Sequence, residues 1–308
     1  MPFDALRSAV GSAGSSAVSS SPQAPGSSAP VAIFDSGLGG LSVLRAVRAA
    51  LPDERLIYVA DSLYAPYGER DDDFIADRTL AIGEWLVSQG AKTLVVACNT
   101  ATSQSIAQTR ERLPIPVIGV EPGIKPAALT SQTRVVGVLA TAVTLRSARF
   151  QALAERHTSD CHFILQPGHG LVQAVERCDT KSPELVALLR SYVQPMLDAN
   201  ADTLVLGCTH YPFLDEAIRS IAGDRLTLVD TSVAIARQLE RQLDSFGLRA
   251  APVQAHDRVQ AVELPRFYST NDGLALRQLA GSLLGLDVTV EHVVIPSRRT
   301  LALESDPV

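Results

Sequence analysis

One short pattern occurs twice in this chain, and each copy ends at a cysteine. Residues 93–98 read TLVVAC, and residues 203–208, which lie 110 positions later, read TLVLGC. Apolar, β-branched runs of this length are typical of strands buried in a parallel sheet. Two further apolar runs, around Ile118 and Leu228, are separated by the same distance. The chain is therefore predicted to have two similar halves, each with a cysteine at the carboxyl end of a strand.

Apolar runs alternate with segments of helical spacing from residue 31 onward. Such alternation predicts parallel sheets with helices on both faces. The predicted fold class is α/β, with two pseudo-symmetric doubly wound parallel-sheet domains facing a central cleft. Residues 266–269 form one more strand candidate, which has no counterpart in the repeat. Strands are expected at 31–34, 56–60, 93–98, 117–120, 135–139, 163–166, 203–208 and 226–229, and helices at 41–50, 74–89, 103–113, around 172–176 and at 183–200.

Charge and hydropathy limit the kinds of partner that this protein can have. Of the 308 residues, 46% are hydrophobic and 19% are charged, and the net charge is −6. This balance argues against a general nucleic-acid binder or a protein of anionic membrane surfaces. No apolar run approaches the roughly 20 residues that span a bilayer. We therefore expect no nucleic-acid partner and no membrane partner.

Cysteine usage and the first residues suggest where the protein works. Four cysteines in a chain of 308 residues do not form a disulfide framework, and their spacing is not that of a zinc site. A reducing cytoplasm is the expected compartment. Residues 1–30 are rich in Ser, Ala, Gly and Pro and lack the apolar core of a secretory signal. They are expected to form a disordered extension.

Cys98 and Cys208 are the first candidates for chemistry. A lone cysteine at a strand end is more often part of the core than a catalyst. Here both follow the same strand pattern, at strand ends where α/β proteins bind ligands. Each is expected just before a helix N-terminus, where the helix dipole favours a thiolate. Two thiols on either side of a carbon could remove a proton from one face and return it to the other.

Polar residues near these strand ends complete the candidate site. Asp35 and Ser36 end the first strand, and the carboxylate could hold an ammonium group or orient a thiol, besides capping a helix. Glu176 could hydrogen-bond His210, although a solvated helix face is an equally good interpretation. The segment Tyr67-Gly68 could offer backbone N–H groups, or be a plain turn. Asn99, Thr100, Thr209 and His210 could cradle a carboxylate or simply cap helices.

A glycine-rich run offers a competing interpretation. Gly37-Leu38-Gly39-Gly40 follows a strand, as in a dinucleotide site, and Asp61 would then be the acid that binds the ribose. Ser42 occupies the position of the third glycine of that motif, and Asp35 would face the pyrophosphate with like charge. This hypothesis also leaves both cysteines without a role, so we set it aside.

The ordered motifs resemble those of the glutamate racemases, in the aspartate/glutamate racemase superfamily. The resemblance covers residues from about 31 to 232, and many ordered segments carry it. One departure lies in the tail, where the family usually has Thr-Gly-Asp and this chain has Thr270-Asn271-Asp272. The matching segments are residues 33–44, 65–68, 97–102, 137–141 with Thr144, and 207–212.

The resemblance implies interconversion of L- and D-glutamate without a cofactor, supplying D-glutamate for peptidoglycan. It implies that Cys98 is the base for D-glutamate and Cys208 the base for L-glutamate, with Asp35, Glu176 and His210 as auxiliary acid/base groups. It also implies a first domain of residues 31–124 plus 233–308 and a second domain of residues 125–232. The implied substrate contacts are Asp35, Ser36, Tyr67, Gly68, Asn99, Thr100, Thr141, Thr144, Thr209 and His210.

Other functions remain open at this stage. A racemase for aspartate or another amino acid would use the same scaffold. A hydrolase with one nucleophilic cysteine would leave the second cysteine idle, and a regulatory protein could use residues 1–30 as a binding arm. The expected partner is the small-molecule substrate glutamate, and a homodimer is left open.

Overall fold

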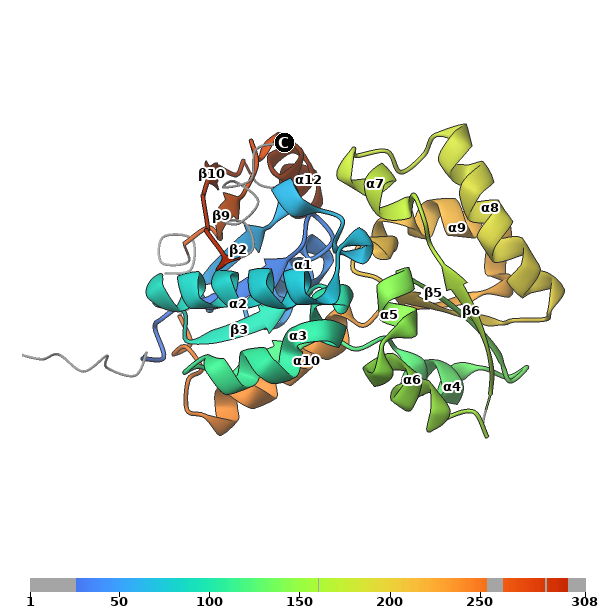
Figure 1. Ribbon diagram of the computed structural model, residues 1–308, viewed down its shortest axis with the longest axis horizontal. Helices are drawn as coiled ribbons and strands as arrows, with labels where there is room; N and C mark the ends of the chain where they lie inside the picture. The colour runs from blue at the N-terminus through green and yellow to red at the C-terminus, as the bar shows by residue number, and fades with distance from the viewer. Residues whose placement is uncertain (1–25, 160, 254–262, 286, 299–308) are drawn as a thin grey trace, which may run out of the picture.

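The computed structural model describes residues 26–159, 161–253, 263–285 and 287–298, which form two α/β lobes (Figure 1). The first lobe is built on a six-stranded sheet of order β10-β9-β2-β1-β3-β4, and all neighbouring strands in it are parallel. Its strands are β1 (Val31–Asp35), β2 (Leu56–Ala60), β3 (Thr93–Val96), β4 (Val117–Gly119), β9 (Arg266–Ser269) and β10 (Val290–His292).

The second lobe repeats the central part of this sheet. Its four parallel strands have the order β6-β5-β7-β8, which corresponds to β2-β1-β3-β4 of the first lobe. The offset of 110 residues holds for the starts of β3 and β7 and for both bounds of β4 and β8. The predicted fold class is therefore confirmed. The strands are β5 (Val135–Ala140), β6 (His162–Pro167), β7 (Thr203–Gly207) and β8 (Thr227–Val229).

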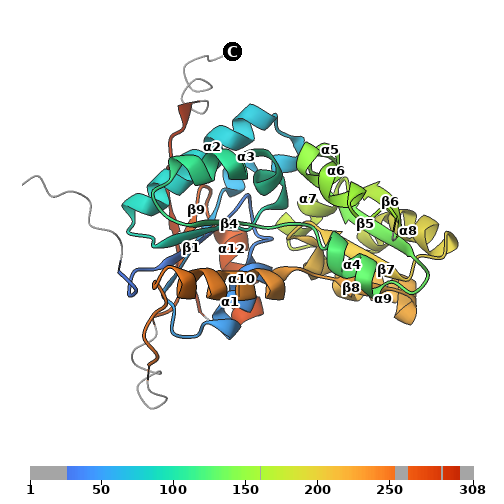
Figure 2. The ribbon, with the colours of Figure 1, turned by 90° about the horizontal axis from the view of Figure 1, so that it is seen from below.

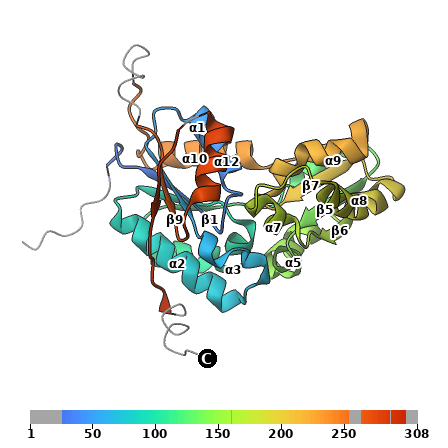
Figure 3. The same cartoon turned by 90° about the horizontal axis from the view of Figure 1, so that it is seen from above.

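Helices cover both faces of the first sheet (Figures 2 and 3). Side chains alternate across each strand, so Ile33 of β1 packs toward α1, α10 and α12, whereas Phe34 packs toward α2 and α3. Asp71 caps α2 by accepting the Phe74 N–H at 2.8 Å, and Gly90, with φ of +81°, follows its end. The helices are α1 (Leu41–Ala50), α2 (Asp72–Ser88), α3 (Asn99–Arg112), α10 (Ser232–Ser245) and α12 (Leu274–Leu284), with short 3-10 helices η1 (Ser62–Tyr64) and η2 (Tyr67–Glu69).

The second sheet is covered in the same way. Leu204 and Leu206 of β7 pack toward α7, α8 and α9, and Val205 packs toward α4 and α6. Every central strand is thus buried on both faces, which explains its continuous apolar sequence. The helices are α4 (Ile124–Thr130), α5 (Ala142–Arg146), α6 (Ala148–Glu155), α7 (Leu171–Glu176), α8 (Pro183–Asp198) and α9 (Asp215–Ala222), with 3-10 helices η3 (Tyr211–Leu214) and η4 (Gly223–Arg225).

The chain after β8 returns to the first lobe. Helix α10 packs on α1 through Ile235, Leu239 and Leu243, which belong to the same core cluster as Val47. Strand β9, the candidate without a counterpart, pairs with β2, and β10 extends the sheet beyond β9. The sequence did not predict β10, because its three residues are half-buried or exposed and carry no apolar pattern.

The N-terminal boundary differs slightly from the expected one. Residues 1–25 of the expected extension lie outside the described residues. Residues 26–30 are described, and within them the Ala29 N–H donates to the Gly26 carbonyl at 3.0 Å. Lys92 Nζ donates to the Ser27 carbonyl, which attaches this turn to the start of β3. No helix within the described ranges is long and apolar enough to cross a membrane.

Candidate active site

The carboxyl ends of the central strands bring the candidate residues together between the lobes. Asp35 ends β1, Cys98 lies two residues beyond β3, and Cys208 directly follows β7. Thr209 Oγ1 donates to Asp35 Oδ1 at 3.2 Å, which joins the two strand ends across the lobes. Only 5% of Cys98 and 7% of Cys208 are exposed, so both thiols are shielded from bulk water.

Cys98 stands at the N-terminus of a full helix, as predicted. Its sulfur accepts the Ala101 N–H at 3.4 Å and thereby caps α3. Ser36 Oγ lies 3.3 Å from the same sulfur. Burial raises the pKa of Cys98 to about 12, and the nearby Asp35 carboxylate adds to the rise. In the free protein this cysteine is therefore a thiol.

Cys208 has a histidine and a carboxylate beside it. Its sulfur lies 3.7 Å from His210 Nδ1, and His210 Nε2 lies 2.5 Å from Glu176 Oε1. The predicted hydrogen bond between Glu176 and His210 is thus confirmed. Burial alone would lower the pKa of His210, but hydrogen bonds to Cys208 and Glu176 outweigh burial and raise it well above its usual value. The hydrogen bonds to Glu176 and Cys208 therefore favour the protonated form of the imidazole.

The prediction of a helix N-terminus immediately after Cys208 is wrong. Thr209 and His210 lie in a turn, followed by the 3-10 helix η3, and the α-helix begins only at Asp215. Pro212 occupies the start of η3, where a residue without an N–H is tolerated. Cys208 therefore does not stand at the N-terminus of an α-helix, and its sulfur faces the His210 ring instead.

The glycine-rich loop after β1 is explained by close approach of the second lobe. A Cβ on Gly37 would lie 2.0 Å from Glu176 Oε1, and a Cβ on Gly39 would lie 2.4 Å from His210 Nδ1. The Leu38 N–H donates to Glu176 Oε1 at 2.7 Å. These glycines thus admit a carboxylate and an imidazole from the other lobe, which is a different role from binding a dinucleotide.

The Asp35 carboxylate fixes the same glycine-rich loop through two hydrogen bonds. Its Oδ2 accepts N–H groups from Gly37 at 3.3 Å and Gly40 at 3.0 Å. Burial raises the pKa of Asp35, although the nearby His210 and the loop amides oppose the rise. Tyr58, which the sequence analysis did not single out, donates from Oη to the Gly37 carbonyl at 2.8 Å.

Hydroxyl groups from both lobes meet near the N-terminus of α3. Thr100 Oγ1 lies 2.9 Å from Thr141 Oγ1, and Thr141 Oγ1 lies 2.9 Å from Thr144 Oγ1. A Cβ on Gly68 would lie 3.2 Å from Thr141 Cβ, so the segment containing Gly68 packs against this group. Among the described residues, the buried Asn99 Nδ2 has no hydrogen-bond partner.

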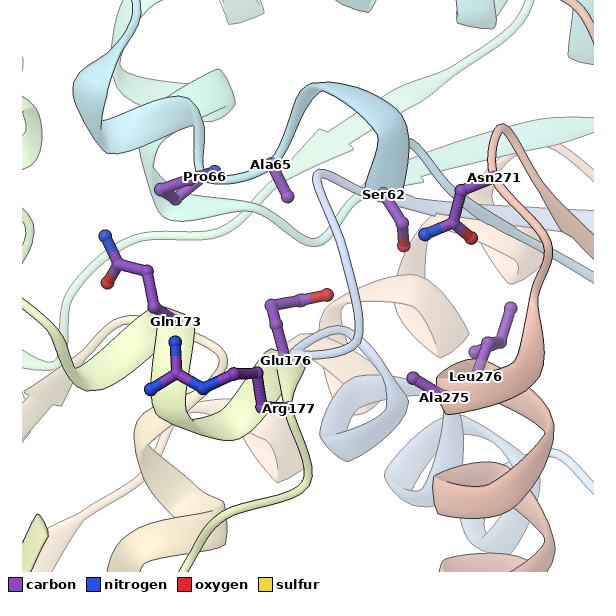
Figure 4. Close-up of a pocket in the computed structure, with 9 residues that line it drawn as sticks. All are labelled: Ser62, Ala65, Pro66, Gln173, Glu176, Arg177, Asn271, Ala275 and Leu276. Atoms are coloured by element: carbon purple, nitrogen blue, oxygen red, sulfur yellow. The ribbon is translucent and has the colours of Figure 1, made fainter.

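A cavity of about 270 Å³ borders the site (Figure 4). Glu176 belongs to its lining and also contacts His210, which connects the cavity to the Cys208 side. Within the ranges that the structure describes, no three His, Cys, Asp or Glu side chains are grouped to hold a metal ion. The cavity is lined by Ser62, Ala65, Pro66, Gln173, Glu176, Arg177, Asn271, Ala275 and Leu276.

A buried ion pair that was not predicted from the sequence lies beside the site. Arg78 and Asp61 have fully buried side chains, and Arg78 Nη2 lies 2.7 Å from Asp61 Oδ1. The signal was present in the sequence, because Arg78 occupies the apolar face of α2 between Ile75 and Ile82. A cation at a core position of a helix implies a buried partner.

The chain is similar in sequence to proteins of a known family. The family model for Asp/Glu/Hydantoin racemase matches residues 41–239. The glutamate racemase of Ralstonia pickettii (strain 12J) is 60% identical over 257 residues, covering 83% of this chain and 88% of that protein. Sequence similarity thus extends over most of both lobes.

Solved structures have the same fold. The Escherichia coli glutamate racemase, in complex with L-glutamate and the activator UDP-MurNAc-Ala, has a TM-score of 0.76 and 31% identity, covering 87% of this chain and 100% of that one. The Francisella tularensis glutamate racemase, in complex with D-glutamate, has a TM-score of 0.74 and 27% identity, covering 87% and 98%. The resemblance inferred from the motifs is confirmed: this chain belongs to the Asp/Glu/Hydantoin racemase family.

Proposed function

We propose that this enzyme interconverts L- and D-glutamate by proton transfer between two cysteines, with Cys98 and Cys208 as its bases. One observation carries the proposal: a buried thiol lies at the equivalent strand end of each lobe. Relatives named glutamate racemase support the choice of glutamate as substrate. The D-glutamate product would serve peptidoglycan synthesis.

The reaction starts with one cysteine as thiolate and the other as thiol. The thiolate removes the α-proton of glutamate, the Cα–H bond breaks, and its electron pair stays on Cα, delocalised into the α-carboxylate. The opposite thiol then donates its proton to the other face of Cα. The configuration inverts, and the two sulfurs exchange protonation states. We assign Cys98 as the base for D-glutamate and Cys208 as the base for L-glutamate.

Electrostatics decide when a thiolate can form. Burial and the Asp35 carboxylate disfavour the thiolate of Cys98 in the free protein. The α-ammonium of bound glutamate brings a positive charge into this buried space and lowers the cost of ionising a thiol. The protonated His210 does the same for Cys208 from the protein side. Exclusion of water strengthens both interactions.

Substrate recognition is assigned to the polar groups around the two thiols. The unpartnered Asn99 amide is a free donor for a carboxylate oxygen. We assign Asp35 as the acceptor for the α-ammonium, and His210 and Glu176 as auxiliary acid/base groups. The remaining proposed contacts come from Ser36, Tyr67, Gly68, Thr100, Thr141, Thr144 and Thr209.

We also propose domain boundaries and a compartment. The boundaries are residues 31–124 plus 233–308 for the first domain and 125–232 for the second, since α10, β9 and β10 pack on the first lobe. The cytoplasm is the proposed compartment, because all four cysteines are free thiols. Light scattering on the purified protein tests the homodimer that the sequence left open.

Circular dichroism of L-glutamate mixed with the pure enzyme, without added cofactor, tests the proposed function. The signal is expected to decay to zero as the racemate forms. A signal that stays constant at high enzyme concentration would overturn the proposal. The same assay with L-aspartate, L-glutamine and L-alanine tests substrate choice, and faster decay with aspartate would make this an aspartate racemase.

A further inference from the structure

A buried charge cluster lies next to the proposed substrate site and has no part in the proton transfer. Arg78 of α2 donates from Nε to Asp61 Oδ2 at 3.0 Å and from Nη2 to Asp61 Oδ1 at 2.7 Å. Neither side chain is exposed. A bidentate pair in a buried place fixes both partners in one geometry. Asp61 directly follows β2, and its N–H donates to the Asp35 carbonyl at 3.0 Å.

The same carboxylate holds Tyr67. Tyr67 Oη donates to Asp61 Oδ2 at 2.5 Å, and its ring packs against Phe34, with ring centroids 6.2 Å apart. Burial and the Asp61 charge raise the pKa of Tyr67 well above its usual value, so the hydroxyl stays protonated and remains a donor. Tyr67 begins η2, and Gly68 in the same turn packs against Thr141 of the other lobe.

The carboxy-terminal segment supplies the third partner. Arg78 Nη1 donates to the carbonyl of Ile295. The Ile295 side chain is 5% exposed and packs in the apolar cluster that contains Tyr67 and Cys98, whereas the neighbouring Val294 is 73% exposed. In Figure 3 the dark red segment beyond β9 passes over α2 toward the C-terminus. A segment almost 200 residues after Cys98 in the chain thus reaches the surroundings of the site.

We propose that Asp61, Arg78 and the Ile295 carbonyl are positioning groups that hold the Tyr67-Gly68 segment where it binds the substrate. We call them, with Tyr67, the Asp61 cluster. The inference rests on the proposed function, because it assigns the cluster to glutamate binding and not to proton transfer. Loosening the cluster lowers affinity for both enantiomers, since both use the same binding segment.

A second buried ion pair in the same lobe provides a matched control. Lys92 Nζ lies 2.5 Å from Glu54 Oε2, and the two side chains are 0% and 2% exposed. This pair stands at the amino ends of β2 and β3, the opposite edge of the sheet from the cysteines. Replacing its carboxylate destabilises the fold without touching the substrate segment.

The first experiment compares Asp61→Asn with Glu54→Gln, which change a carboxylate to an amide of the same size. We expect Asp61→Asn to raise KM for L- and D-glutamate by about 10-fold, with kcat changed by less than about 3-fold, because a charge-assisted contact in a binding segment is lost. Glu54→Gln is expected to lower the melting temperature and leave KM unchanged. Equal KM values in the two variants would overturn the proposal.

A second set of variants keeps the ion pair intact and covers the case in which Asp61→Asn does not fold. Tyr67→Phe removes only the hydroxyl, and Ile295→Ala loosens the segment that carries the carbonyl, with Val294→Ala as its control. We expect the first two to raise KM by about 3- to 10-fold and their double variant to raise it by less than the product, as for residues of one network. KM factors that multiply, or an unchanged KM in both single variants, would contradict the shared cluster. Wild-type protein inactive on glutamate would instead overturn the proposed function.

Discussion

The two cysteines occupy equivalent positions in a duplicated fold, but their surroundings differ. Cys98 caps an α-helix and contacts the Ser36 hydroxyl. Cys208 is followed by a turn and a 3-10 helix, and its neighbour is the His210 ring, which is paired with Glu176. Duplication therefore preserved where each thiol lies, at a strand end, while the loops that follow changed the groups beside it.

This difference suits a reaction between mirror-image substrates. The value of kcat/KM must be the same for the two enantiomers, because the equilibrium constant between them is one. The protein does not need to treat them with the same chemistry. The Cys98 sulfur has a hydroxyl and one backbone N–H beside it, and the Cys208 sulfur has an imidazole.

Loss of either thiol should nearly stop racemisation and leave hydrogen exchange at one face of Cα. Cys98→Ser and Cys208→Ser are each expected to lower kcat/KM by about 10²- to 10⁴-fold, the usual worth of a general base. With one base left, Cys208→Ser should still exchange the α-hydrogen of D-glutamate in D₂O, and Cys98→Ser that of L-glutamate, both with retention. Proton NMR of each enantiomer measures this exchange. Exchange of the same enantiomer by both variants would contradict the assignment of faces.

His210 should matter less than the thiols and only for the Cys208 side. His210→Asn removes the cation next to Cys208, and we expect kcat/KM to fall by about 10- to 100-fold, the range for losing a hydrogen bond to a charged group. His162→Asn, which replaces an exposed histidine of β6, serves as the control. Relative to the wild type, the primary isotope effect should increase more with α-deuterated L-glutamate than with α-deuterated D-glutamate. That result would show that proton removal by Cys208 is the step that became slower. Equal isotope effects would argue against a one-sided role.

Glu176→Gln should change how stability depends on pH. The folded pKa of His210 is raised by its partners, so its stabilisation is complete below the unfolded value of about 6.5 and is lost as pH rises through the raised folded value. The Glu176→Gln variant lacks one of these partners. At pH 6, His210 therefore stabilises the variant less than it stabilises the wild type. Between pH 6 and pH 10 the melting temperature should therefore fall more steeply for the wild type. The difference in melting temperature between the wild type and the variant should become smaller. A constant gap would mean that Glu176 does not set the protonation of His210.

The sequence predicted the sheets and most helices because their signal is local. Helix α1 and strands β2 and β9 have the predicted bounds, and the offset of 110 residues located β4 and β8. The helix after Cys208 was predicted wrongly, because the rule that a helix follows each strand ignored Pro212 in η3. Local patterns do not reveal which turn conformation precedes a helix.

The candidate site was predictable only where neighbours in sequence carried the chemistry. Cys98 with Asn99 and Cys208 with His210 are visible as short motifs, and the contact of Glu176 with His210 was one of two interpretations that the sequence allowed. The contact of Arg78 with Asp61 and the Ile295 carbonyl joins three distant segments. The sequence indicates that Arg78 has a buried partner, but only the folded chain reveals which groups it contacts.

The smallest expected effect tests the Cys98 side. Ser36→Ala removes the hydroxyl 3.3 Å from the Cys98 sulfur, a contact that opposes the rise in the pKa of that thiol. We expect kcat/KM to fall by about 2- to 10-fold in both directions, the worth of one neutral hydrogen bond. Because proton removal by Cys98 becomes slower, the primary isotope effect should increase with α-deuterated D-glutamate and stay nearly constant with L-glutamate, the reverse of the pattern for His210→Asn. If Ser36→Ala and His210→Asn changed the isotope effect of the same enantiomer, Ser36 and His210 would assist the same cysteine. That result would contradict the assignment of one group to each thiol.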